Sequence, residues 1–330
     1  MMDRRTFIGG VTGGLLAVPF AARAQQDART RRIGILMGIA ENDPEGQARV
    51  AAFRQGLQDL KWVEGRNIRI DIRWGTGDAT RVKAYAAELV SLAPDVILAT
   101  NTPTVRALQQ ATRAIPMVFA GLTDPVGDGA VTSFSKPGGN ITGFSSFDPA
   151  IAGKWLQLLK EISVNIVRVA VIFNPDTAPH SIFLPALEAA ALSVGVKLVL
   201  ATVRDTAAIE NAIATLGRES GGGLVVMPDV FVAGHRELVI ALAARYRVAA
   251  VYPFRYWVAQ GGLLAYGPDI VDQYRRVTAY IDRILQGAKP ADLPVQAPTK
   301  FELAINLKTA KALGLTIPPT VLLRADEEIQ

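Results

Sequence analysis

Short apolar runs alternate with helically spaced apolar residues along this chain. Residues 33–37 form a continuous apolar run, and Val50, Phe53, Leu57 and Leu60 then recur at helical spacing. Such a run predicts a buried strand, and such spacing predicts an amphipathic helix. The same alternation predicts strands at 33–37, 68–74, 96–99 and 115–120 and near 141, with helices at 47–61, 82–92 and 103–112. The first half therefore reads as a βα-repeat sheet.

The second half repeats this order after a predicted helix at about 150–162. The pattern predicts strands at 167–173, 197–202, 224–227, 249–252 and 263–266, with helices at 181–192, 207–216, 236–246, 271–286 and 306–313. The last of these elements are too few for a third domain, so we expect them to be shared between the first two. The sequence thus predicts an α/β protein with two lobes and parallel-type sheets.

Length and composition agree with two domains. The chain has 330 residues, 50% of them hydrophobic and 20% charged, which excludes a disordered or collagen-like chain. At roughly 150 residues per domain, this length corresponds to two domains. The chain contains no cysteine, which excludes disulfides, thiolate metal sites and a lipid anchor on cysteine.

Residues 1–24 have the features of an export signal peptide. Arg4 and Arg5 precede a short glycine-rich apolar run, and Ala22 and Ala24 form an A-x-A cleavage motif. The adjacent arginines resemble a twin-arginine signal, although Asp3 stands where serine or threonine is usual. The export route, twin-arginine or general, stays open.

Removal of this segment changes the charge of the chain only slightly. The formal charge falls from +5 to +3, because three arginines and one aspartate are lost. Such a charge does not predict nucleic-acid binding, and no later apolar run is long enough to cross a membrane. We therefore expect a soluble, untethered monomer in the periplasm of a two-membrane bacterium.

Small polar and acidic residues follow the predicted strands of both lobes. In open parallel sheets the carboxyl ends of the strands share one edge, and ligands bind there. The candidate ligand-binding residues are Asn101, Thr102, Thr123 and Asp124 in the first lobe, and Asn174, Thr177, Asp229 and Tyr266 in the second. A helix N-terminus with hydroxyls suits a carboxylate, and an aspartate suits an ammonium group. The set predicts a site for an amino-acid-sized zwitterion, although each Thr, Asn or Asp is also explained as a helix cap. Most aromatic residues near 252–266 are expected in the core, and Tyr266, at a strand end, is the one expected to stack on a ligand ring.

Three stretches carry a resemblance to a known family. They are residues 56–60 with 63–68, residues 124–127 with 137–143, and residues 306–318. In these stretches, and over essentially the whole mature chain, the sequence resembles the tryptophan/tyrosine-type substrate-binding proteins of ABC transporters.

The resemblance implies the type I periplasmic-binding-protein fold, a Venus flytrap in which three hinge crossovers join two Rossmann-like lobes. On this chain the N-terminal lobe would comprise 25–144 plus about 265–295, and the C-terminal lobe 145–264 plus about 296–330. The crossovers would fall near 142–147, 252–264 and 294–301. The resemblance also implies capture of a small carboxylate-bearing solute, an amino acid of aromatic or hydrophobic type, in the cleft between the lobes. An inner-membrane ABC permease would receive this ligand.

Two other function classes remain open. An α/β enzyme is disfavoured, because no nucleophile elbow, phosphate loop or dinucleotide loop follows a predicted strand, although paired carboxylates still allow acid–base chemistry. A ligand-sensing module would carry a helix-turn-helix or membrane helices, and the sequence has neither. With two histidines and no cysteine a metal centre is also disfavoured. The main prediction is a binding protein with no catalytic residue, cofactor or metal.

Overall fold

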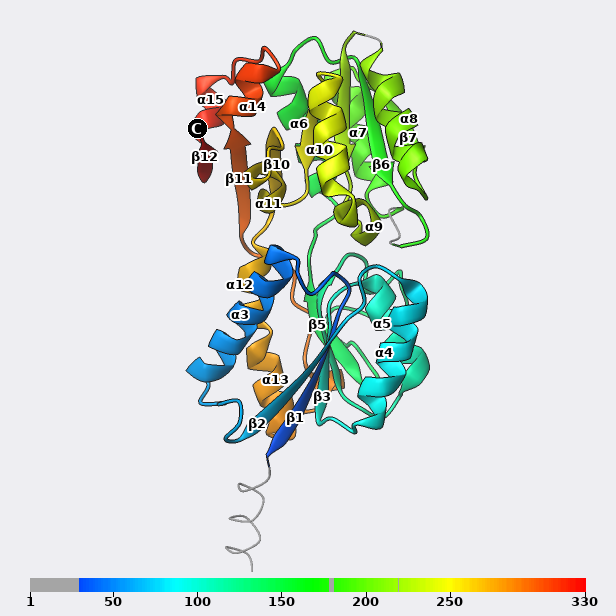
Figure 1. The fold of residues 1–330 in the computed structure, drawn as a ribbon, viewed down its shortest axis with the longest axis vertical. Helices are drawn as coiled ribbons and strands as arrows, with labels where there is room; N and C mark the ends of the chain where they lie inside the picture. Colours follow the sequence, from blue (N-terminus) through cyan, green and yellow to red (C-terminus); the bar gives the residue numbers. More distant parts are fainter. Residues whose placement is uncertain (1–29, 178–180, 219) are drawn as a thin grey trace, which may run out of the picture.

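A computed structural model describes residues 30–177, 181–218 and 220–330 of the chain. These residues form two lobes, one above the other in Figure 1, each built on its own sheet. The predicted signal peptide, residues 1–24, lies outside the described residues. None of the described helices combines the length and apolarity that crossing a membrane requires.

The first lobe contains a five-stranded parallel sheet in the order β2-β1-β3-β4-β5. Its strands are β1 (Arg31–Met37), β2 (Ile68–Trp74), β3 (Val96–Ala99), β4 (Met117–Leu122) and β5 (Ile141–Ser145). One face is covered by α3 (Pro44–Asp59), α12 (Ile270–Arg276) and α13 (Thr278–Leu285), and the other by α4 (Ala79–Ser91) and α5 (Thr102–Ala111). Because both faces are covered, the central strands are continuously apolar.

The second lobe contains a seven-stranded sheet in the order β12-β11-β10-β9-β8-β6-β7. Its strands are β6 (Arg168–Phe173), β7 (Lys197–Thr202), β8 (Gly222–Val226), β9 (Ala249–Tyr252), β10 (Leu264–Pro268), β11 (Phe301–Asn306) and β12 (Glu327–Ile329). The β10–β11 pair is antiparallel, and the other described pairs are parallel. The helices of this lobe are α6 (Ile151–Ile162), α7 (Leu184–Val194), α8 (Thr206–Gly217), α9 (Val230–Gly234), α10 (Arg236–Arg245), α11 (Arg255–Ala259), α14 (Leu307–Ala312) and α15 (Pro319–Leu322). The two-lobed α/β fold predicted from the sequence is confirmed.

Many helices begin directly after an aspartate or asparagine that caps them. In each case a side-chain oxygen accepts a hydrogen bond from an N–H of the first turn, which has no partner within the helix. These caps are Asp43, Asp78, Asn101, Asp205, Asp229, Asp269 and Asn306. Since several of these helices follow the carboxyl ends of parallel strands, their caps gather at the edges of the sheets where the two lobes face each other.

The chain passes between the lobes three times. The first passage follows β5 and the third precedes β11, and they lie side by side because the N–H of Ser145 donates to the carbonyl of Gln296 at 2.8 Å. The second passage comes between β10 and α12, later than the expected segment 252–264. That segment lies inside the second lobe, because Tyr252 and Trp257 are buried there and stack at 5.0 Å. Strand β10 therefore belongs to the second lobe, and the chain returns to the first lobe only at α12.

Candidate ligand-binding cleft

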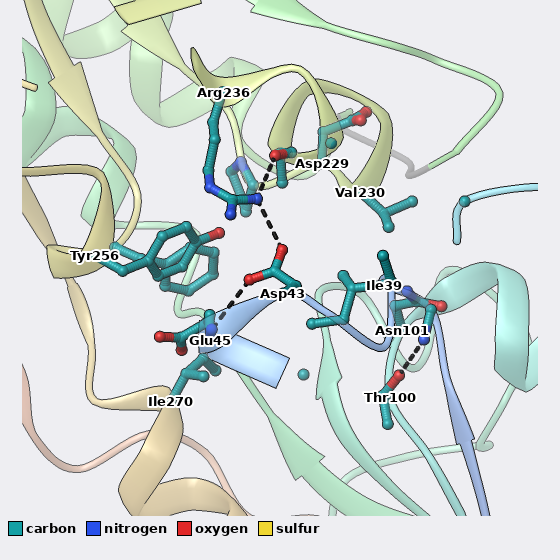
Figure 2. Close-up of a pocket in the computed structure, with 18 of the residues that line it drawn as sticks. Ile39, Asp43, Glu45, Thr100, Asn101, Asp229, Val230, Arg236, Tyr256 and Ile270 are labelled. Atoms are coloured by element: carbon teal, nitrogen blue, oxygen red, sulfur yellow. Dashed lines mark hydrogen bonds and ion pairs between the residues drawn. The ribbon is translucent and has the colours of Figure 1, made fainter. Parts of the chain in front are cut away.

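A cavity of about 680 Å³ lies between the two lobes, at the carboxyl ends of the strands of both sheets. Its walls include the loops after β1, β3 and β4 and helix α12 in the first lobe, and the segments after β6, β8 and β9 in the second. Figure 2 shows the two walls facing each other, with Thr100 and Asn101 on one and Asp229 and Arg236 on the other. This is the edge at which parallel α/β sheets bind ligands.

The wall of the first lobe is held by hydroxyl and amide side chains. The Thr100 hydroxyl accepts from the N–H of Gly38 at 2.9 Å and donates to a carbonyl of β1, which ties β3 to β1 at the cleft. The Asn101 side-chain oxygen accepts from the N–H of Thr104 at 3.1 Å, and the Thr104 hydroxyl accepts from the N–H of Asn101 in return. The Asn101 Nδ2 group makes no hydrogen bond within the described part of the chain, so this amide is a donor available to a ligand.

Thr102 lines the cavity, but its hydroxyl already has a hydrogen-bond partner within the protein. It donates to Asp128 at 3.0 Å, and Arg106 pairs with the other oxygen of the same carboxylate at 2.9 Å. Burial raises the pKa of Asp128, while Thr102 and Arg106 act in the opposite direction. Thr102 therefore lines the cavity and at the same time holds the loop after β4 against α5.

On the second lobe, Asp229 organises the wall. Its Oδ1 accepts from the N–H of Val232 at 2.9 Å and caps α9. Its Oδ2 accepts from the N–H of Asn174 at 3.0 Å and from the Thr177 hydroxyl at 2.8 Å. The carboxylate thus joins the ends of β6 and β8 and sits at the cavity surface, 7% exposed.

The structure brings some of the candidate residues together at the cavity and leaves others outside its lining. Those that line it are Asn101, Thr102, Thr123, Thr177 and Asp229. Those outside the lining are Asp124, Asn174 and Tyr266. Asp124 closes a turn by accepting from the N–H of Gly127 at 2.8 Å, and Asn174 accepts from the N–H of Asp176. The ring of Tyr266 stacks on Phe301 at 5.9 Å.

A buried arginine on α3 is the main cleft residue that the strand-end pattern does not reveal. The guanidinium of Arg49 donates to Glu45 at 3.0 Å, and their side chains are only 13% and 15% exposed. It also lies 5.9 Å from the ring centre of Tyr256 and 5.8 Å from that of Tyr274. Burial disfavours its charge, but Glu45 and the two tyrosines outweigh burial and hold the pKa of Arg49 above its ordinary value. The cleft therefore contains a permanent cation fixed between two aromatic rings.

Of the two tyrosines around Arg49, Tyr274 is buried and Tyr256 is partly buried, and both are uncharged. Burial raises the pKa of Tyr256 to about 12, and it raises that of Tyr274 as well. The rings come from α11 and α12, that is, from the second lobe and from the segment just after the second passage. Arg49 thus marks a place where three distant parts of the chain meet.

An ion pair links the two walls of the cleft directly. Arg236 at the start of α10 donates to Asp43 at 2.8 Å, and it also donates to Gln260 at 2.7 Å. Asp43 belongs to the first lobe, where its other oxygen accepts from the N–H of Glu45 and caps α3. Figure 2 shows Arg236 reaching down to Asp43 beside Tyr256.

The chemistry offered by the cleft is that of a binding site for a small polar molecule. Its walls present a buried cation, a free amide, hydroxyls, carboxylates and aromatic rings. No group of three or more His, Cys, Asp or Glu side chains within the described residues is arranged to hold a metal ion.

Comparisons with known proteins agree with this geometry. The family model described as ABC transporter substrate binding protein matches residues 33–329. A curated relative, the tyrosine-binding protein of Clostridioides difficile, is 27% identical over 263 residues, which are 80% of this chain and 75% of the relative. A conserved domain protein from Vibrio cholerae superposes with a TM-score of 0.85 at 30% identity, over 91% of this chain and 100% of that one. An ABC domain in complex with L-Trp from Streptococcus pneumonia superposes with a TM-score of 0.84 at 26% identity, over the same shares of the two chains. The fold is that of the type I periplasmic binding proteins.

Proposed function

This chain belongs to the family of ABC transporter substrate binding proteins, and from that premise we propose that it binds an aromatic amino acid between its lobes and delivers it to a membrane permease. The family resemblance seen in the sequence is thereby confirmed. The choice of ligand class is supported by the relatives, of which one is named for binding tyrosine and another was solved with L-Trp.

The observation that carries the proposal is the fixed guanidinium of Arg49 at the cavity. An arginine that presents a rigid, planar set of donors is suited to a carboxylate. Its position between Tyr256 and Tyr274 adds aromatic surface beside the cation, and this surface suits a ligand that carries both a carboxylate and a ring. The ammonium group of the ligand would lie toward the acidic wall that Asp229 contributes.

The remaining parts of the proposal rest on the family and on the sequence. We take the protein to bind its ligand without chemical turnover, because the family and the curated relative are both named for binding. The export pattern of residues 1–24 supports a periplasmic location, where an inner-membrane permease would be the partner.

Calorimetry with chemically trimmed ligands tests this function. Residues 25–330 would be titrated with L-tyrosine, L-tryptophan and L-phenylalanine, and in parallel with tyramine, which lacks the carboxylate. We expect saturable binding of at least one amino acid and none of tyramine. At a ligand concentration of 100 times Kd, the bound form should gain about 2.7 kcal/mol of stability against unfolding. Binding of none of the three amino acids, tyramine binding as tightly as tyrosine, or conversion of the ligand to a product in mass spectrometry would overturn the proposal.

A further inference from the structure

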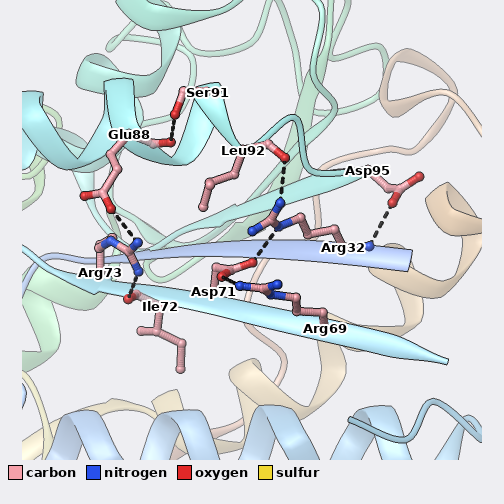
Figure 3. A network of polar contacts seen from close by, with 9 residues as sticks. All are labelled: Arg32, Arg69, Asp71, Ile72, Arg73, Glu88, Ser91, Leu92 and Asp95. Atoms are coloured by element: carbon pink, nitrogen blue, oxygen red, sulfur yellow. Dashed lines mark hydrogen bonds and ion pairs between the residues drawn. The ribbon is translucent and has the colours of Figure 1, made fainter. Parts of the chain in front are cut away.

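Strand β2 leaves one edge of the first sheet without a partner strand among the described residues. It is the outer strand of the order β2-β1-β3-β4-β5. Among the described strands it pairs only with β1, and its first residue, Ile68, also forms an isolated bridge with Glu64. The N–H of Arg31 donates to the Asn67 carbonyl, and the N–H of Gly75 donates to the Met37 carbonyl. These two hydrogen bonds show which residues along β2 have backbone groups that face β1. In a parallel pair alternate residues bond to the neighbour. The backbone groups of Ile70, Ile72 and Trp74, the residues out of phase, therefore point to the outer edge, where the Ile72 carbonyl accepts a hydrogen bond from the Arg73 guanidinium at 2.9 Å (Figure 3).

A groove of about 500 Å³ runs along this edge. It is bordered by α3 on one face of the sheet and by α4 on the other. Its lining residues are Glu41, Gln47, Val50, Arg54, Ile72, Arg73, Trp74, Thr76, Arg81 and Tyr85. A free strand edge between two helices has the width and the hydrogen-bonding groups for one more extended strand.

The two faces of β2 differ in character. Ile70, Ile72 and Trp74 are partly buried and pack against the apolar core on the α3 side. Because side chains alternate along a strand, Asp71 and Arg73 lie on the α4 side. Figure 3 shows this polar side, where Asp71 is already paired with Arg32 at 2.7 Å and Arg73 reaches Glu88 at 2.5 Å.

The lining of the groove contains more basic than acidic side chains. Arg54, Arg73 and Arg81 line it against one carboxylate, Glu41. Arg54 and Arg73 each have an ion-pair partner that is more than 40% exposed, whereas Arg81 forms no ion pair with any described residue. An added strand would thus meet apolar side chains on one face and arginines on the other.

A second copy of this chain is a poor occupant of the edge. Antiparallel pairing of β2 with itself about Asp71 would place Asp71 opposite Asp71 and Arg69 opposite Arg73. Like charges directly opposite each other destabilise a strand pair. An occupant with acidic residues at alternate positions would instead place carboxylates opposite Arg73 and Arg81.

We propose that the free edge of β2 binds an extended polypeptide segment that alternates apolar and acidic residues, as an additional strand of the first sheet. Its backbone pairs with Ile70, Ile72 and Trp74 and displaces the Arg73 guanidinium from the Ile72 carbonyl. Its apolar side chains cover the same three residues, and its acidic side chains meet Arg73 and Arg81. Of the residues that line this groove, only Thr76 also lines the cavity of the proposed amino-acid site, so either site can be absent without the other.

Fluorescence anisotropy with a labelled peptide that alternates valine and glutamate tests the proposal. We expect saturable binding that weakens with added salt, and none with the matching valine–lysine peptide. Arg81→Glu should weaken the interaction by about fivefold. Arg113→Glu makes the same change of charge at an exposed position of the same lobe, away from the groove, and should have no effect.

A proline substitution separates strand addition from simple charge attraction. Ile70→Pro removes an N–H that points to the free edge and keeps every hydrogen bond to β1, and proline is tolerated on edge strands. The variant should melt as a folded protein and lose the peptide, while Ile70→Val should keep it. The proposal would be overturned by absence of saturable binding, by equal binding of the lysine peptide, or by full binding by a folded Ile70→Pro variant. The role of the arginines would then be to protect the strand edge against pairing with other chains. Calorimetry of the cleft ligand on the same variants reports on the amino-acid site independently.

Discussion

The ion pair between Asp43 and Arg236 joins the two walls of the cleft, so its removal should favour separation of the lobes. The donor and acceptor atoms lie 2.8 Å apart, and the Arg236 and Asp43 side chains are 13% and 11% exposed. Arg236→Gln removes the cation. Asp43→Asn removes the charge and still caps α3, because asparagine caps a helix as well as aspartate does. The two single variants and the double variant form a thermodynamic cycle.

The expected change in the closing equilibrium follows from the low solvent exposure of the Asp43–Arg236 pair. A hydrogen bond between charged groups contributes about 1.5–3 kcal/mol net, and the middle of this range, about 2 kcal/mol, changes the closing equilibrium about thirtyfold. Arg255 and Glu327 are the contrast, since they lie 3.0 Å apart with side chains 56% and 42% exposed. Exposed pairs contribute about 0.2–1 kcal/mol. Both residues of this pair belong to the second lobe, so its loss should leave closing unchanged.

Distance measurements between the lobes give the closing free energy directly. The chain has no cysteine, so cysteines introduced at the exposed Lys83 on α4 and Glu210 on α8 place one dye in each lobe. Single-molecule energy transfer then gives the populations of the closed and separated forms. We expect a coupling energy between Asp43→Asn and Arg236→Gln of about 2 kcal/mol in closing. A coupling below about 0.5 kcal/mol, or one equal to that of the Arg255–Glu327 control, would refute the reasoning.

Further predictions concern the cleft and the first lobe. Arg49→Gln should weaken aromatic amino-acid binding in calorimetry by about a hundredfold, because it removes the buried cation, whereas Arg49→Lys keeps the charge and should recover part of the affinity. Unchanged affinity of Arg49→Gln would contradict the assigned role. The pKa of Asp71 lies below its ordinary value of 3.8, mainly because Arg32 donates a hydrogen bond to it. Its stabilising effect is therefore present above about pH 4 and is lost as the pH falls through the lower folded pKa. The free energy of unfolding in urea should fall less between about pH 6 and about pH 3 for Asp71→Asn than for the parent protein. An equal fall would contradict a stabilising role of the Arg32–Asp71 pair. Gly38→Ala would place a Cβ 1.7 Å from Nδ2 of Asn101. The Asn101 cap must then shift, at a cost of about 1 kcal/mol in denaturant unfolding, and an unaltered midpoint would show that the cap adapts.

Much of the fold follows from local sequence patterns. The apolar run at 96–99 and the helical spacing at 82–92 became β3 and α4, since parallel strands buried on both faces have a recognisable composition. The strand-end positions of Asn101 and Asp229 were also predictable, because parallel strands bring their carboxyl ends to one edge. What these patterns cannot separate is a residue that only caps a helix from one that also faces the cavity. Asp124 and Asp229 look alike in sequence and differ in this respect.

The parts that escaped prediction depend on contacts between distant segments. Arg49 lies within a helix and not at the end of a strand, and its partners Tyr256 and Tyr274 are far away in sequence. No local period links these residues. Strand β11 was missed for a related reason, because it is antiparallel to β10 and enters the sheet only after the chain has visited the other lobe. The family resemblance places a crossover at the aromatic segment around Trp257, which instead belongs to the core of the second lobe.

The three passages between the lobes also determine the order in which this protein can become complete during synthesis. The core of the first lobe includes Tyr274, Ile281 and Leu293, and the second sheet is finished by β11 and β12. A nascent chain that has emerged as far as β9 holds most of both sheets and lacks the helices that cover the α3 side of the first. Neither lobe can mature as an early, independent unit on the ribosome. Both must wait for nearly the full chain, which keeps the polypeptide incompletely folded until translation is almost over.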